Sequence, residues 1–195
     1  MNIKLTLAKT IVTLVITLPV WAQSRMPELS LGDPAPDLDI TIIEGEPIDL
    51  GNDKGEHVFL VEFWATWCPA CRASMPHLSE LQKKYEDEGL VVVGISIEED
   101  PDVVRAFVDE DRSRMKYTVA VDRNLATAYK YMLPFGEENI PHAFVVDKSG
   151  TLVWHGHPAD PSLEQLLVEL LENGIDTTAE AQPHPKEPRP KPASR

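Results

Sequence analysis

Two cysteines, Cys68 and Cys71, are the residues of this chain best suited to chemistry. They are the only cysteines among 195 residues, and two residues separate them. The apolar segment from Val58 to Thr66 predicts a buried strand before them, and the segment after them predicts a helix. Backbone N–H groups and the helix dipole at a helix start favour a thiolate. The spacing therefore predicts a dithiol that opens and closes, with Cys68 as nucleophile and Cys71, one turn on and sheltered, as the resolving thiol.

Other roles for the cysteine pair fit the sequence less well. A zinc site would need a second cysteine pair, and His155 and His157 lie too close together for the usual ligand spacing. Covalent haem attachment would need a histidine where the chain has Arg72. A permanent disulfide across so short a loop would restrict the unfolded chain very little. We therefore expect redox exchange, with no metal and no organic cofactor.

The N-terminal residues 1–22 have the pattern of a secretory signal peptide. Lys4 and Lys9 come before an apolar run from Thr10 to Val20. This run is shorter than the roughly 20 residues that span a bilayer. Small residues around Trp21 suit cleavage after residue 22, and an uncleaved membrane anchor is the alternative. Export would place the chain where disulfides persist.

Residues 23–176 are long enough for one folded domain, and residues 177–195 are predicted to be a disordered, proline-rich basic tail. The formal net charge of -14 argues against nucleic acid and against anionic lipid surfaces as partners.

Strands and helices alternate along the predicted domain. An edge strand over residues 38–43 and a turn at residues 44–47 predict an N-terminal hairpin. The continuous apolar run over residues 90–97 predicts a strand buried on both faces, so helices must cover both sides of the sheet. A hairpin over residues 143–155 and a helix from Pro161 complete an α/β fold with a mixed sheet. The cysteines fall at the carboxyl end of a central strand, where such sheets carry their sites.

Four sequence features resemble the thioredoxin superfamily, and more closely its exported TlpA/ResA-like thiol-disulfide oxidoreductases. They are the motif over residues 63–71, Pro76 inside the helix, Ile140-Pro141 before a strand, and the turn over residues 147–150. The resemblance implies a thioredoxin-like fold, with a central mixed β-sheet flanked by helices and an N-terminal β-hairpin extension. It implies an enzyme that reduces disulfides of extracytoplasmic proteins, in cytochrome c maturation or general thiol upkeep. A membrane dithiol relay would supply its electrons.

Glu62 stands where the resemblance places a buried acid beneath the cysteines. Strand alternation puts it on the face of Leu60 and Trp64. A buried carboxyl has a raised pKa and is able to accept the proton of Cys71 during resolution. The alternative is a glutamate that points to solvent or pairs with a lysine.

The remaining predicted site residues surround the dithiol and concern the substrate. Ile140-Pro141 resembles the family's cis-proline site, where the backbone of the preceding residue pairs with an extended substrate; a trans proline is the alternative. Trp67 either shields the thiol face or lies in the core. Pro69 and Ala70 replace the Gly-Pro of thioredoxin and tune the reduction potential, so the direction of electron flow stays open.

Two further functions compete with disulfide exchange. A peroxiredoxin-like thiol peroxidase would have threonine three residues before its cysteine, whereas Thr66 is two before Cys68. A non-catalytic binding or chaperone module would be expected to have lost part of the site. The insert over residues 132–139 and the stretch over residues 154–158 depart from the thioredoxin core, and His157 is predicted to be a surface histidine.

Overall fold

The computed structural model describes residues 29–51, 53 and 55–173. The predicted signal peptide and the predicted tail lie outside these residues. Within them, no helix has the length and apolar character needed to cross a bilayer.

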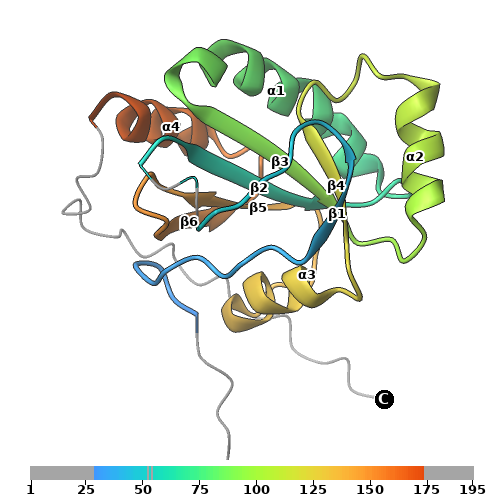
Figure 1. Ribbon diagram of the computed structural model, residues 1–195, viewed down its shortest axis with the longest axis horizontal. Helices are drawn as coiled ribbons and strands as arrows, with labels where there is room; N and C mark the ends of the chain where they lie inside the picture. Colours follow the sequence, from blue (N-terminus) through green and yellow to red (C-terminus); the bar gives the residue numbers. More distant parts are fainter. Residues whose placement is uncertain (1–28, 52, 54, 174–195) are drawn as a thin grey trace, which may run out of the picture.

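Six strands form a single mixed sheet in the order β1-β4-β3-β2-β5-β6 (Figure 1). Strands β2, β3 and β4 run parallel, while β1 pairs antiparallel with β4, β5 with β2, and β6 with β5. Their bounds are β1 Ile40–Glu44, β2 Val58–Trp64, β3 Leu90–Ser96, β4 Thr118–Asp122, β5 His142–Val146 and β6 Leu152–Gly156. The predicted buried strands β2 and β3 are therefore the central pair of the sheet.

Helices cover both faces of this sheet, as the continuous apolar strands predict (Figure 1). Buried side chains of α1, α2 and α4 pack on one face, and α3 with the segment before β1 packs on the other. The helices are α1 Pro69–Tyr85, α2 Pro101–Glu110, α3 Ala126–Tyr131 and α4 Pro161–Asn173, with short 3-10 turns at η2 Glu86–Glu88 and η3 Leu133–Phe135. Each strand thus contributes to two hydrophobic layers.

Helix boundaries follow the local signals. Asp100 caps α2 by accepting a hydrogen bond from the amide of Asp102 at 2.9 Å, and proline occupies the first helical position. Pro76 lies inside α1. Gly89 ends the turn after α1 with φ 100°, a conformation that glycine adopts without strain. The chain then enters β3 directly.

The N-terminal hairpin is the part of the predicted fold that is not seen. The predicted edge strand is present as β1, but its antiparallel partner is β4 and not a strand that follows it directly in the sequence. In the described residues between β1 and β2 no further strand is formed. The remaining predicted elements are present, including the closing hairpin of β5 and β6 and the final helix.

Candidate active site

The dithiol lies where β2 ends and α1 begins. Cys68 is the N-cap residue of α1, and Cys71 follows within the first helical turn. The two form a disulfide with 5.3 Å between their Cα atoms, and the amide of Cys71 donates to the Cys68 sulfur at 3.1 Å. Cys71 has no exposed surface, and Cys68 is 5% exposed. The helix start therefore directs an amide at the outer sulfur, which favours its thiolate.

The residues next to Cys68 form an exposed rim. Trp67 is 64% exposed, so the alternative of a core tryptophan is wrong. Pro69 and Ala70 are exposed as well. An incoming polypeptide would meet this rim before it reached the disulfide.

The Ile140-Pro141 segment comes to the dithiol from a distant part of the chain. The peptide bond between the two residues is cis, so the alternative of a trans proline is wrong. The carbonyl oxygen of Ile140 lies 3.8 Å from the Cys68 sulfur. This arrangement presents a backbone acceptor beside the outer cysteine.

Glu62 is buried beneath α1, on the sheet face that carries both cysteines. It is 1% exposed, and neither carboxylate oxygen has a hydrogen-bond partner among the described residues. Burial raises its pKa to about 8. Its neighbours across β3 and β5 are the two smallest possible, Gly94 and Ala143. The alternative of a solvent-exposed or lysine-paired Glu62 is wrong.

Tyr117 lies near this buried acid and was not singled out from the sequence. Its hydroxyl is buried without a hydrogen-bond partner among the described residues. Burial raises the pKa of Tyr117 well above its usual value, and the charge of Glu62 adds to this effect. The phenol therefore stays protonated and is able to donate to a negative charge nearby.

Glu98 holds the loop before Cys68 and was also missed. Its carboxylate accepts hydrogen bonds from both the amide and the hydroxyl of Thr66, the amide bond measuring 2.9 Å, and from the hydroxyl of Ser96. Glu98 follows β3 and Thr66 follows the parallel strand β2, so both stand at the same sheet edge. The position of Glu98 just after an apolar strand was the available signal.

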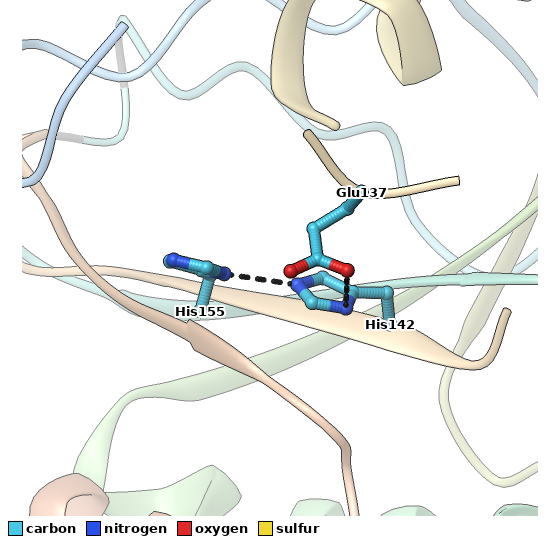
Figure 2. A group of neighbouring side chains, drawn as sticks. All are labelled: Glu137, His142 and His155. Atoms are coloured by element: carbon cyan, nitrogen blue, oxygen red, sulfur yellow. Dashed lines mark hydrogen bonds and ion pairs between the residues drawn. The ribbon is translucent and has the colours of Figure 1, made fainter. Parts of the chain in front are cut away.

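A second polar cluster occupies the opposite face of the sheet (Figure 2). His142, the first residue of β5, faces His155 of β6, with 3.1 Å between Nε2 of His142 and Nδ1 of His155. An oxygen of Glu137, from the loop before β5, lies 3.7 Å from Nδ1 of His142. Burial, with smaller contributions from neighbouring histidines, lowers the pKa of His142 to about 4, so its ring is neutral at pH 7. His157 is exposed, as predicted.

Comparison with known proteins gives a consistent result. Residues 31–155 match the AhpC/TSA family. The chain is 30% identical over 149 residues to the thiol-disulfide oxidoreductase ResA of Bacillus cereus, covering 75% of this chain and 82% of that protein. It is 33% identical over 124 residues to the thioredoxin-like protein YneN of Bacillus subtilis, covering 62% of this chain and 68% of that one.

Solved structures agree with this relationship. A putative protein disulfide isomerase from Bacteroides thetaiotaomicron superimposes with a TM-score of 0.63 at 27% identity, covering 73% of this chain and 91% of that one. A putative thiol:disulfide interchange protein DsbE from Chlorobium tepidum gives 0.57 at 26% identity, covering 73% and 96%. With its paired Cys68 and Cys71 at a helix start, the chain belongs to the AhpC/TSA family and is a thioredoxin-like thiol-disulfide oxidoreductase.

Proposed function

We propose that the protein is exported and reduces disulfides of extracytoplasmic proteins through Cys68 and Cys71. The observation that supports this most directly is the paired cysteines at the start of α1, with the outer sulfur 3.8 Å from the Ile140 carbonyl. The motif Trp67 to Cys71 is then the redox centre.

The proposed reaction is two successive exchanges at sulfur. The thiolate of Cys68 attacks one sulfur of the substrate disulfide, and the other substrate sulfur leaves as a thiolate that takes a proton. The thiolate of Cys71 then attacks the Cys68 sulfur of this mixed disulfide and releases the second substrate thiol. Two electrons pass to the substrate, and the Cys68–Cys71 disulfide is left closed.

Glu62 is proposed as the group that takes the proton from Cys71. Cys71 is fully buried, so water cannot remove its proton directly. Glu62 is also buried and lies on the same face of the sheet as Cys71. Its pKa of about 8 is close to that of an ordinary thiol. A base of matched pKa transfers a proton at the lowest cost.

The rim and the cis-proline segment are proposed to bind the substrate. The exposed side chains of Trp67, Pro69 and Ala70 supply apolar contact, while the backbone beside Ile140 supplies hydrogen bonds to an extended chain. Main-chain recognition of this kind makes small demands on substrate sequence.

The location, the client and the electron donor are further parts of the proposal. Residues 1–22 direct export, and a membrane dithiol relay returns the centre to its reduced state. Apocytochrome c is the proposed client, with general thiol upkeep as the broader role. Sequencing of the exported protein should find residue 23 as its first; a start at residue 1 would instead support an uncleaved anchor.

The test is to trap the proposed mixed disulfide. Cys71→Ser expressed in its native compartment should accumulate covalent complexes with disulfide-bearing proteins, whereas Cys68→Ser should accumulate none. Mass spectrometry of the complexes identifies the clients. Full reductase activity of Cys68→Ser on a disulfide-bonded test protein would overturn the assignment of the nucleophile.

Two measurements separate this proposal from its competitors. Equilibration with a glutathione buffer gives the potential: a value near that of thioredoxin, about -270 mV, supports a reductant, and one near that of DsbA, about -120 mV, an oxidant. Rapid consumption of hydroperoxide would instead favour a thiol peroxidase. Unchanged client binding by the double variant Cys68→Ser/Cys71→Ser, without turnover by the wild type, would favour a binding module.

A further inference from the structure

We propose that Glu137, His142 and His155 bind a divalent transition-metal ion of the zinc type. One ligand atom from each of the three side chains lies within 4.8 Å of the other two. The sequence analysis predicted no metal, because the zinc sites weighed there all included the cysteines. This cluster lies on the opposite face of the sheet.

The donor set matches the chemistry of such an ion. Two imidazole nitrogens and one carboxylate oxygen are a common combination of protein ligands for zinc when water takes the fourth position. Oxygen-preferring ions such as Mg²⁺ and Ca²⁺ favour carboxylates and carbonyls over imidazole. The cluster therefore points to zinc or a neighbouring first-row ion.

The spacing of the two rings is close to that of a bound pair. Two nitrogens at about 2.0–2.1 Å from a tetrahedral zinc lie about 3.4 Å apart. The two facing nitrogens of His142 and His155 are 3.1 Å apart. A few tenths of an ångström of separation, with a turn of the rings that points both nitrogens at a common position beside the line joining them, would admit an ion.

The remaining ligand stands on the part of the cluster that is free to adjust. Glu137 lies in the loop before β5, its side chain is 32% exposed, and its carboxylate points toward the His142 ring (Figure 2). It contacts Nδ1 of that ring at 3.7 Å, and rotation of the side chain would turn a carboxylate oxygen toward the facing nitrogens.

The surrounding residues hold the rings in place. Phe135 packs on His155 with ring centroids 4.2 Å apart, and Phe144 stacks on the same ring at an interplanar angle of 24°. His142 is itself buried. Rings fixed in this way lose little further freedom when they coordinate, which strengthens binding.

Coordination by both facing nitrogens requires that neither of them carries a proton. One of the two facing nitrogens holds the proton of their hydrogen bond. That proton moves to the other nitrogen of the same ring, and both facing nitrogens then coordinate. His157 is close by in sequence, but it is exposed and is not a member of this cluster, so we assign the fourth position to water.

The ion would join the loop that presents Ile140 to the sheet beneath it. Glu137 comes three residues before Ile140, and His142 two residues after it. Binding would therefore restrict the segment beside the dithiol, although the ion and the cysteines lie on opposite faces. We expect Zn²⁺ to slow amide hydrogen exchange over residues 136–140 of the wild type and not of Glu137→Gln.

Binding is tested on the purified protein with its disulfide closed, so that neither thiol is a ligand. Isothermal titration calorimetry with Zn²⁺ should show one ion bound per chain. Co²⁺ should give the intense visible absorption of a four-coordinate site. Glu137→Gln, which keeps the shape of the side chain, and His155→Gln should each bind at least about tenfold more weakly. His77→Gln, on α1, is the matched control for His155→Gln and should bind like the wild type.

Thermal melting without metal establishes whether each variant is folded. If His155→Gln is unfolded, the test uses Glu137→Gln alone. Three results would overturn the proposal: no binding by the wild type, equal binding by the wild type and Glu137→Gln, or a Co²⁺ spectrum of a six-coordinate site. None of them bears on disulfide exchange, which is measured separately.

Discussion

Glu62→Gln is the variant with the most specific expected outcome. In the folded protein burial raises the pKa of Glu62 from 4.5 to about 8. The folded state therefore holds a proton that the unfolded chain releases at neutral pH. The stability contributed by this group is complete below about pH 4.5 and is lost as the pH rises through 8.

The size of the effect follows from the same two values. Each pH unit between them lowers the free energy of unfolding by about 1.4 kcal/mol, so the whole interval of about 3.5 pH units corresponds to about 5 kcal/mol. Glutamine has nearly the same shape and does not titrate. The variant should therefore gain stability relative to the wild type by about 1.4 kcal/mol per pH unit from pH 5 to pH 8.

The measurement is urea unfolding of both proteins, with the disulfide closed, at one-unit steps from pH 5 to pH 9. Taking the difference between the two cancels the titration of every other group. Glu80→Gln, the same substitution at an exposed position of α1, is measured alongside as the control. A stability of Glu62→Gln relative to the wild type that is flat with pH, or that falls from pH 5 to pH 8, would refute the reasoning.

Three further substitutions test individual contacts in the fold and beside the site. Gly94→Ala places a methyl group 2.9 Å from the Tyr117 ring and should lower the free energy of unfolding by about 1–3 kcal/mol in urea. Asp122→Ala removes the carboxylate that accepts from two amides at the start of α3, at 2.7 and 2.9 Å, and should cost about 1–3 kcal/mol by the same measurement. Glu98→Gln weakens its hydrogen bonds to Thr66, so the Thr66 amide should exchange faster with solvent; unchanged exchange would contradict this role.

The sequence predicted the elements of this fold well because their signals are local. Pro161 marked the start of α4, and continuous apolar residues marked β3 as buried on both faces. Glu62 was identified from the family resemblance, and alternation along the strand gave only the face on which it lies. Such signals do not depend on which strand becomes the neighbour.

Features that depend on pairing between distant segments were missed. The strand β1 pairs with β4, some 80 residues away, and nothing within residues 38–47 specifies that partner. Glu137, His142 and His155 come from a loop and two strands, so their sequence spacing resembles no metal motif. Trp67 followed a buried strand and was open to a core assignment, yet the turn into α1 leaves it exposed.

The pairing of β5 with β2 sets a strict limit on how this chain can vary. Ala143 faces the dithiol layer, while His142 and Phe144 face the aromatic layer on the other side. A shift of β5 by one residue that moved His142 into the place of Ala143 would turn the strand over, placing an imidazole beside Glu62 and a methyl group among the phenyl rings. Changes of length in the preceding loop are therefore tolerated only if they leave this register intact. Changes of residue type in the loop do not alter the register.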